Sequence, residues 1–444
     1  MIERVNELIE KRSFIELRNE LIEMNAADIA AILEDLSNPD TIKIFRLLPK
    51  DLAADVFSYL SIEVEQFIIT SLTANEAGNL IDNMFADDAA DLLDEMPANV
   101  VTRLLAQASP ETRRDINHLL KYPEDSAGSI MTVEFVALKE NSSVSAAIDR
   151  IRATAGESAD FSTCYVLDVR RTLIGTVELR DIILSKPDIL ISDIMTENYI
   201  SVKTHDDQEE VAEAFKKYDC TSMPVVDAEG RLVCIITIDD IVDIIEQEAT
   251  EDIEMMAAIT PTDKPYMKTG VFETWKKRIP WLLLLMISAT FTGQIIHHYE
   301  EALGAYIVLT AFIPMLMDTG GNAGSQASVT IIRGLSLNEI EFHDIWRIIW
   351  KEFRVSICVG ITLAVANFAK LMLIDQVGLL ISTVVCATLV FTVIVAKLVG
   401  CTLPVLAKKI GFDPAVMASP FITTIVDALS LMIYFTIATN ILGL

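Results

Sequence analysis

The sequence predicts a multidomain membrane protein in which an all-α N-terminal superhelical domain and an α/β tandem pair of domains precede an α-helical transmembrane domain with five spans. Three observations lead to this prediction. Short amphipathic segments fill the first 126 residues, a strand–helix pattern then occurs twice, and long apolar runs follow Pro280. The mean hydropathy of +0.40, with 52% apolar residues among 444, is also high for a soluble chain.

The net charge of −29 is concentrated in the front part of the chain. From Trp281 onward there are ten acidic and eight basic side chains, so −27 of the charge precedes Trp281. A clustered carboxylate field attracts cations and argues against nucleic acid or anionic lipid as a partner. An acidic surface kept only for solubility explains the charge about equally well.

Residues 1–126 are predicted to form an acidic helical N-domain. The segments NAADIAAILEDLS, PKDLAADVFSYLS, ANEAGNLIDNM and ADDAADLLDEMP each combine a polar start, an acidic first turn and aliphatic side chains at i, i+3, i+4 and i+7. Short amphipathic helices in series bury their apolar faces by stacking, which predicts a small superhelix. Such a domain supplies an interaction or sensor surface, not a catalytic one.

Residues 127–190 and 191–246 are two copies of an internal repeat. The segments SIMTVEFVALK and ELRDIIL of the first copy align with DIMTENYISVK and TIDDIVDII of the second, so that Met131 pairs with Met195. Each copy predicts strand, helix, strand, strand and helix, the pattern of a compact α/β pair. The repeat resembles a pair of cystathionine-β-synthase (CBS) domains, which are cytosolic regulatory modules.

Residues 247–275 are predicted to be an acidic connecting helix and a linker. One long acidic helix is expected over residues 239–258, because a proline follows it closely. Like charges three and four residues apart, as at Glu248, Glu251 and Asp252, destabilise a helix unless something neutralises them. A bound divalent cation would supply that neutralisation.

Residues 276–444 are predicted to form the transmembrane domain. Its five apolar stretches are Trp281–Ile296, Leu303–Met317, Val355–Ile374, Val377–Leu406 and Val416–Leu444. Lys and Arg gather before the first stretch, between the second and third, and between the fourth and fifth. The positive-inside rule therefore puts the N-terminus and the soluble domains in the cytoplasm and the C-terminus outside, across the inner or plasma membrane of the cell. The first twelve residues lack the apolar core of a signal peptide, in agreement with this orientation.

Polar residues within these stretches are the candidates for an ion path. Asp427 lies deep in the last stretch, and an intramembrane carboxylate usually faces a cavity or an ion path, although a hydroxyl on a neighbouring helix could also satisfy it. DTGGNAGSQ at 318–326 predicts a broken helix end whose amide and freed carbonyl oxygens suit a hard cation. Glycine-based helix packing is the alternative. The residues expected to line the pore are Gly320, Gly321, Asn322, Gly324 and Gln326.

Lys397 is another charge within the apolar stretches. Lys397 is nearer the cytoplasmic end of its stretch, and snorkelling towards the membrane surface accounts for it without a functional role.

The order of these parts resembles the MgtE family of magnesium transporters or channels over nearly the whole chain. The most specific marks are DTGGNAGSQ at 318–326, EATEDI at 248–253 and DPAV with TTIVD within 413–427. The resemblance implies a homodimer in the lipid bilayer that moves largely hydrated Mg²⁺ through a pore between its protomers. It also implies that cytoplasmic Mg²⁺ closes the pore by binding between the N-domain, the CBS pair and the connecting "plug" helix.

The resemblance further implies roles for particular acids. By position, Asp427 would be the pore carboxylate. The regulatory Mg²⁺ ligands would be Asp87, Asp91, Asp207, Glu209, Asp219, Asp240, Asp243, Glu248, Glu251, Asp252 and Asp413.

Some CBS pairs bind adenosine nucleotides through an aspartate at the start of their last helix. Asp181 in ELRDII and Asp240 in TIDDIV occupy such positions. Because Asp240 is also implied as a cation ligand, Asp181 is the candidate for binding ATP.

The sequence does not predict an enzyme. It contains no HExxH, GxSxG, Walker or CxxC motif, and its six cysteines are scattered. The alternatives to a Mg²⁺ transporter are a CBS-regulated transporter of Mn²⁺ or Co²⁺, an anion channel, and a non-conducting membrane Mg²⁺ sensor. An anion pore would be lined by basic residues and helix N-termini, whereas the deep charge here is acidic. A sensor would not need Asp427.

Overall fold

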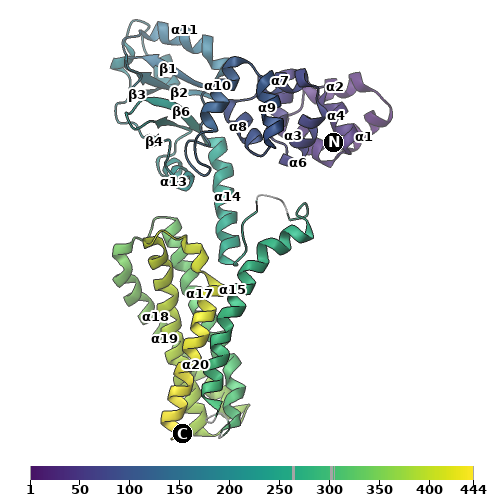
Figure 1. Ribbon diagram of the computed structural model, residues 1–444. Coiled ribbons are helices and arrows are strands. Elements are labelled where there is room, and N and C mark those ends of the chain that lie inside the picture. Colours follow the sequence, from purple (N-terminus) through teal and green to yellow (C-terminus); the bar gives the residue numbers. More distant parts are fainter. Residues whose placement is uncertain (1, 263–265, 301–303, 305, 444) are drawn as a thin grey trace. The chain divides into compact units, whose positions relative to one another are not determined.

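The structure is a computed structural model that describes residues 2–262, 266–300, 304 and 306–443 (Figure 1). The chain divides into two compact units, Met1–Ile245 (unit 1) and Glu246–Leu444 (unit 2). Leu303, where the second span is expected to begin, and Leu444, where the last is expected to end, lie outside the described residues.

Short helices fill the first part of unit 1. They are α1 (Ile2–Glu10), α2 (Phe14–Ile22), α3 (Ala26–Asp35), α4 (Asn38–Phe45), α5 (Lys50–Phe57), α6 (Ile62–Ser71), α7 (Ala74–Ile81), α8 (Ala86–Asp94), α9 (Ala98–Gln107) and α10 (Pro110–Leu119). The predicted helical N-domain is thereby confirmed.

Local capping sets where these helices begin. At α7, the Thr73 hydroxyl accepts a hydrogen bond from the Glu76 backbone N–H, and the Glu76 carboxylate accepts one from the Thr73 N–H. At α3, the Asn25 side chain accepts a backbone N–H in the first turn. Each cap satisfies N–H groups that have no partner within the helix.

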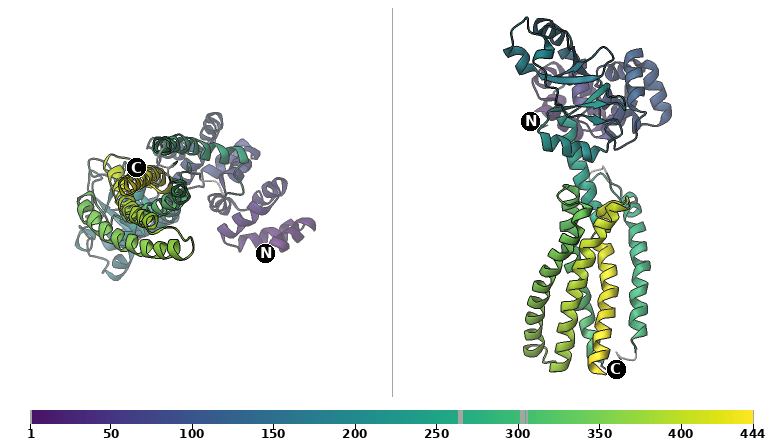
Figure 2. Two further views of the ribbon diagram at one scale, coloured as in Figure 1. Left: turned by 90° about the horizontal axis from the view of Figure 1, so that it is seen from below. Right: turned by 90° about the vertical axis from the view of Figure 1, so that its left-hand side faces the viewer.

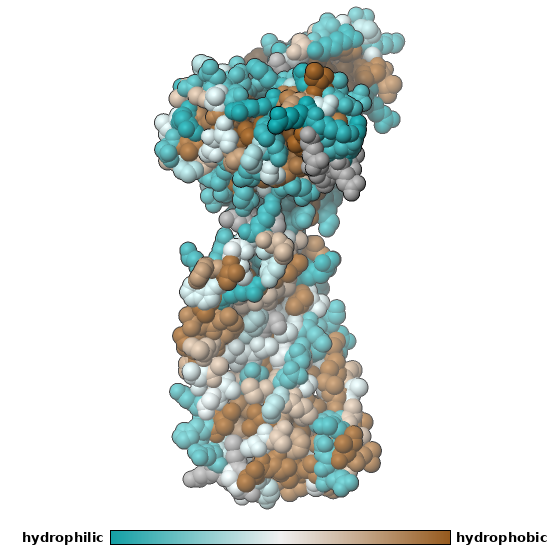
Figure 3. Space-filling model, turned by 90° about the vertical axis from the view of Figure 1, so that its right-hand side faces the viewer, coloured by the Kyte–Doolittle hydropathy of each residue, from teal (hydrophilic) through white to brown (hydrophobic). Residues whose placement is uncertain are grey.

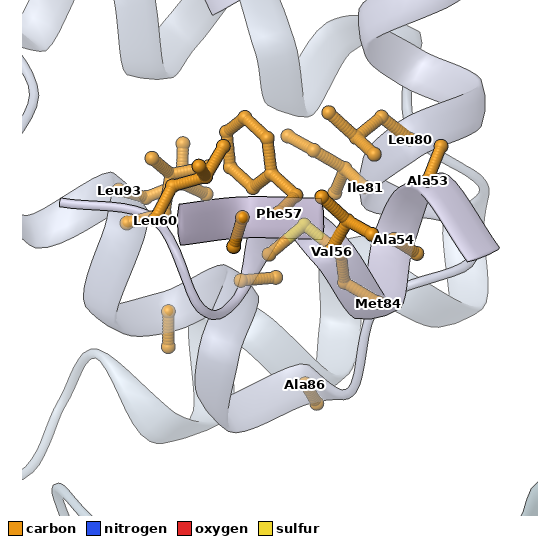
Figure 4. Close-up of a cluster of buried hydrophobic side chains, with 14 of the residues drawn as sticks. Ala53, Ala54, Val56, Phe57, Leu60, Leu80, Ile81, Met84, Ala86 and Leu93 are labelled. Carbon is orange, nitrogen blue, oxygen red and sulfur yellow. The ribbon is translucent and has the colours of Figure 1, made fainter. Parts of the chain in front are cut away.

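The aliphatic faces of successive helices form one core. Phe57 of α5, which is fully buried, lies among Leu60, Leu80, Ile81 and Leu93, and these side chains come from neighbouring helices and turns (Figure 4). The helices are too short to be stable alone, so this stacking stabilises the domain.

The second part of unit 1 contains two three-stranded sheets with one topology, in the orders β1-β2-β3 and β4-β5-β6. In each sheet the first pair of strands is parallel and the second antiparallel. Their elements are β1 (Phe135–Lys139), α11 (Val144–Thr154), β2 (Asp160–Leu167), β3 (Leu173–Glu178), α12 (Leu179–Leu184), β4 (Val202–Lys203), α13 (Gln208–Tyr218), β5 (Ser222–Val226), β6 (Leu232–Thr237) and α14 (Ile238–Met256). This is the predicted tandem α/β repeat.

A buried hydrogen-bond chain joins the two copies of the repeat. The Tyr165 hydroxyl of β2 donates to the Ser222 hydroxyl of β5 at 2.9 Å, and Ser222 donates to the Asp160 carboxylate at 2.7 Å. Tyr165 is fully buried, so its hydroxyl needs this partner.

Unit 2 is a bundle of long helices that stand side by side (Figures 1 and 2). Within it, α19 packs against α17, α18 and α20, and α15 contacts α20. Its long helices are α15 (Val271–His298), α17 (Ile313–Ser336), α18 (Ile345–Leu373), α19 (Leu379–Lys409) and α20 (Ser419–Leu442).

The number of membrane spans is confirmed only in part. Among the described residues, four helical segments are long and apolar enough to cross a bilayer, namely Val271–His298, Phe342–Leu373, Leu379–Lys409 and Pro414–Leu442. The second expected span, Leu303–Met317, has no such counterpart among these four segments and overlaps α17 only from Ile313 to Met317. α17 itself is long enough to cross a bilayer, but it carries the polar sequence DTGGNAGSQ.

Much of the outer surface of unit 2 is apolar. No described residue of α15 is buried, and Leu282, Met286 and Phe291 are among its exposed side chains. Figure 3 shows many brown and pale residues along these helices, with teal ones among them, whereas teal is more frequent on the surface of unit 1. Hydrocarbon is the environment that suits such a surface.

Candidate cation sites

The sequence DTGGNAGSQ lies inside a continuous helix. α17 runs from Ile313 to Ser336 without a break at Gly320, Gly321 or Gly324. The predicted broken helix end is therefore wrong. The alternative, helix packing on glycine, describes the structure, because close neighbours occupy the space that side chains would need.

These glycines allow α19 and α20 to approach α17 closely. A Cβ on Gly320 would lie 2.9 Å from the Ser430 hydroxyl of α20. A Cβ on Gly400 of α19 would lie 2.2 Å from the carbonyl oxygen of Gly324. Real Cβ contacts are not so short, so any larger residue would push the helices apart.

The two amides of the same segment lie on another face of α17. Asn322 and Gln326 are exposed on the surface of unit 2, whereas Gly320, Gly321 and Gly324 are buried. Asn322 and Gln326 are four residues apart and therefore adjacent on one side of the helix. Polar groups at membrane depth require water or protein beside them, so this face is unsuited to lipid.

Asp427 lies within α20 and is half-buried. It is eight residues after the helix start at Ser419, about 12 Å along the axis. No hydrogen bond or ion pair to its carboxylate is found among the residues that the structure describes. The neighbouring hydroxyl that could have satisfied Asp427 is thus not observed in that part of the chain.

Lys397 forms a buried ion pair. Its Nζ lies 3.3 Å from Glu352 Oε2 of α18, and the two side chains are only 7% and 13% exposed. The expected snorkelling is therefore wrong. Glu352 supplies an opposite charge at the same depth, which lowers the cost of keeping the ammonium group away from water.

A cluster of carboxylates lies where the N-domain meets the CBS pair inside unit 1. The members interact electrostatically with one another, and the backbone N–H of Ala86 donates to one of them, Glu134, at 3.3 Å. We call this group the acidic cluster. It comprises Glu65 of α6, Asp87, Asp88 and Asp91 of α8, Glu134 before β1 and Asp240 of α14.

The acidic cluster favours protonation in the absence of cations. Burial, and then the charges of Asp88 and its neighbours, raises the pKa of Glu65 to about 8. Burial and the charge of Asp240 raise the pKa of Asp88 to about 7, and burial raises that of Asp240 itself to about 6. The same causes hold the pKa of Asp87 well above its usual value. These directions mean that the ionised cluster lacks compensating positive charge.

The acidic cluster suits a cation that keeps part of its water shell better than a cation coordinated by protein groups alone. Within the described ranges, no three His, Cys, Asp or Glu side chains are arranged to hold a metal ion by themselves. Mg²⁺ keeps several of its waters and uses only one or two carboxylates in most proteins. Among the described residues, Asp87 Oδ1 is buried without a hydrogen-bond partner, and such an orphaned oxygen fits a cation or its water shell.

Water can reach the edge of the acidic cluster. A cavity of about 480 Å³ is lined by Asp91 and Asp94 of α8 together with Tyr122, Glu124 and Ser129. Asp91 is exposed in this cavity, unlike Asp87 beside it.

The remaining predicted regulatory acids fall into three groups. In unit 2, Ser336 donates to the Asp252 carboxylate at 3.3 Å, and burial together with the charge of Asp413 raises the pKa of Asp252. In unit 1, Asp207 caps α13 by accepting the Glu209 N–H, and Asp219 ends that helix with a left-handed backbone. The others lie along α14: Asp243, Glu248 and Glu251.

Three members of the acidic cluster were not predicted from the sequence. Glu65 could have been found, because it precedes the buried Ile68 and Ile69 by three and four residues and so lies on the apolar face of its helix. Asp88 stands in ADDAAD, where several registers fit the pattern equally. Glu134 has no local signal, since its partners are distant in the sequence.

Comparison with known proteins covers all of these regions. Family descriptions match as "MgtE intracellular N domain" over residues 24–125, "CBS domain" over 127–187 and 191–247, and "Divalent cation transporter" over 313–437. The magnesium transporter MgtE of Thermus thermophilus is 35% identical over 430 residues, which are 96% of this chain and 95% of that protein.

The chain belongs to the MgtE family. The MgtE magnesium transporter of Bacillus subtilis is similarly close, 33% identical over 99% of this chain and 97% of that protein. Both relatives are named as transporters rather than enzymes. As a member of the MgtE family, this protein is a membrane protein with two CBS domains.

Solved structures of MgtE cytosolic parts resemble the front of this family member. The soluble part of a magnesium transporter is 30% identical, with a TM-score of 0.53, and covers 56% of this chain and 98% of that structure. The cytosolic domain of the Mg²⁺ channel MgtE in complex with ATP is 34% identical, with a TM-score of 0.53, and covers 55% of this chain and all of that structure.

Proposed function

We propose that this protein is a Mg²⁺-selective transporter or channel of the cell membrane, which moves largely hydrated Mg²⁺ through a homodimeric pore and closes when cytoplasmic Mg²⁺ binds its acidic domains. The observation that carries the proposal is Asp427: a half-buried carboxylate on a membrane helix, within the region matched to divalent cation transporters, with no partner in the described ranges. The relatives' names support Mg²⁺ as the ion.

In this proposal, Asp427 and its counterpart from the second protomer face each other across a two-fold axis. Two carboxylates at one level attract a divalent cation, and the water that Mg²⁺ keeps prevents it from being trapped. Asn322 and Gln326 offer further oxygens on the exposed face of α17. Gly320, Gly321 and Gly324 contribute by keeping α17 against its neighbours, which fixes the orientation of that face.

The regulatory part of the proposal rests on the acidic cluster and on the pair Asp252 and Asp413. Mg²⁺ bound to these carboxylates stabilises the compact closed form, and without Mg²⁺ their repulsion favours its opening. Only a difference in affinity between the two forms is required, and several ions together shift the population further than one. The remaining acids proposed as regulatory ligands are Asp207, Glu209, Asp219, Asp243, Glu248 and Glu251.

We also propose that the CBS pair binds ATP through Asp181. Asp181 lies in the first turn of α12, and a carboxylate there can accept hydrogen bonds from the hydroxyls of a ribose. The ATP complex of a related cytosolic domain supports this assignment. Loss of ATP binding in an Asp181→Ala variant, measured by calorimetry, would be the expected result.

Mg²⁺ uptake by proteoliposomes tests the proposed function. Liposomes with the intact chain and an enclosed Mg²⁺ indicator should take up Mg²⁺ faster than protein-free liposomes, and Mg²⁺ on the cytoplasmic side should slow the uptake. A chain without residues 1–126 should be slowed less. Uptake no faster than in empty liposomes would refute transport, and faster uptake of Mn²⁺ or Co²⁺ than of Mg²⁺ would favour the alternative selectivity.

A further inference from the structure

Asp318 is a further carboxylate at membrane depth, besides Asp427 and the paired Glu352. It lies on α17, five residues after the helix start at Ile313 and eighteen before its end at Ser336, or about 7 Å and about 27 Å along the axis. Its side chain is exposed on unit 2, and it makes no hydrogen bond or ion pair with the residues that the structure describes.

Helix contacts place Asp318 at the level of Asp427. Gly320 meets Val426 and Ser430, whereas Gly324 meets Ile422 and Val426, so α17 and α20 run in opposite directions.

The contact between Gly321 and Thr423 sets the register of the two carboxylates. A Cβ on Gly321 would lie 2.9 Å from Thr423 Cγ2. Because the two helices are antiparallel, moving back along α17 and forward along α20 leads in the same direction. About one helical turn from this contact, Asp318 lies three residues before Gly321 and Asp427 lies four residues after Thr423. The carboxylates therefore lie side by side, and the charge of Asp318 acts on Asp427.

Asp318 also shares a face with the two amides of α17. Asn322 and Gln326 follow it by four and eight residues, and all three side chains are exposed. An ionised group on the surface of a membrane helix is costly in hydrocarbon, so this polar row requires water or protein along its length.

We infer that Asp318 is a second cation-binding carboxylate of the ion path, beside Asp427. This inference rests on the proposed function, because it assigns a further ligand to the same path. Each protomer then presents two carboxylates to a hydrated divalent cation. Doubling the negative charge at one level favours a divalent over a monovalent ion, since attraction grows with the charges of both partners.

The first test compares Asp318→Asn with a matched loss of charge elsewhere. Asp375→Asn is the control, because Asp375 lies in the loop after α18 and pairs with Lys370. We expect Asp318→Asn to raise the Mg²⁺ concentration for half-maximal uptake about tenfold, equivalent to about 1.4 kcal/mol. The control should match the intact chain.

The outcomes separate the two proposals. Uptake by the intact chain with no change in Asp318→Asn would overturn the role of Asp318 and leave the proposed transport standing. Absence of uptake by the intact chain would overturn the transport itself.

A second test does not depend on transport. In an Asp318→Cys variant, a cationic, water-soluble methanethiosulfonate should modify residue 318, and Mg²⁺ should slow the reaction. Mass spectrometry of the peptide that contains residue 318 separates it from the native cysteines. Ile361→Cys is the control, because Ile361 is an apolar residue of α18 that is 52% exposed. Reaction at 318 no faster than at 361, or unaffected by Mg²⁺, would contradict the inference.

Discussion

Neutralising Glu65 should stabilise unit 1 when divalent cations are absent. Glu65 is 9% exposed on α6, and its pKa rises from the usual 4.5 to about 8 because of burial and the charges of Asp88 and Asp91. A pH of about 7.5 is three units above 4.5, and each unit lowers the free energy of unfolding by about 1.4 kcal/mol. The raised pKa of Glu65 therefore costs the folded protein about 4 kcal/mol of stability at this pH. Glu65→Gln removes the titrating group and should recover about 2 to 4 kcal/mol of this cost.

The pH dependence follows from the sign of the pKa change. The pKa of Glu65 is higher in the folded than in the unfolded protein, so its contribution to stability is fully present below pH about 4.5 and is lost as the pH rises towards about 8. The intact chain should accordingly lose stability over that range without Mg²⁺, and Glu65→Gln should lose less. Mg²⁺ should reduce the difference, because a bound cation compensates the ionised cluster.

Amide hydrogen exchange of the full-length protein measures this effect locally. At pH about 7.5 with a chelator present, peptides from α6 and α8 should exchange about thirtyfold more slowly in Glu65→Gln, as expected for about 2 kcal/mol. Glu63→Gln is the control, because Glu63 is an exposed acid on the same helix. Equal exchange rates in the intact chain and Glu65→Gln, or an equal slowing in Glu63→Gln, would refute the reasoning.

Two further predictions concern unit 2. Gly400→Ala should lower the melting temperature in a thermal unfolding assay, because the new Cβ would lie 2.2 Å from the Gly324 carbonyl oxygen. Gly293→Ala is the control and should leave the melting temperature unchanged, because its Cβ would have no neighbour within 4 Å; equal melting temperatures of the two variants would contradict the close packing. Lys397→Ala should cost about 3 to 5 kcal/mol in denaturant unfolding because it leaves the buried Glu352 unpaired, and adding Glu352→Gln should restore most of it. A double variant no more stable than Lys397→Ala would argue against the pair.

The architecture of unit 1 was predictable because its signals are local. Capping residues, such as Thr73 and Glu76, and regularly spaced aliphatic residues predict the short helices. The tandem α/β domains could be predicted because the same strand–helix pattern occurs twice in the sequence, which indicates two copies of one structural unit. Asp427 stood out since a carboxylate inside a long apolar run is costly.

The parts that could not be predicted depend on contacts between distant residues. Glycine residues occur both where a helix breaks and where two helices pack closely. Only the close neighbours of Gly320 and Gly324 on other helices show that these glycines serve helix packing. The ion pair of Lys397 with Glu352 could not be predicted from the sequence, because Glu352 is 45 residues away on another helix. The pairing of Asp318 with Asp427 likewise follows from the register of α17 against α20.

The most direct test of the account is Mg²⁺ uptake by liposomes that contain Asp427→Ala at the same protein content as the intact chain. We predict that this variant carries no Mg²⁺ above the level of protein-free liposomes, although it folds and inserts normally. Uptake at the rate of the intact chain would show that the ion does not pass the Asp427 carboxylate, and the proposed path would be wrong.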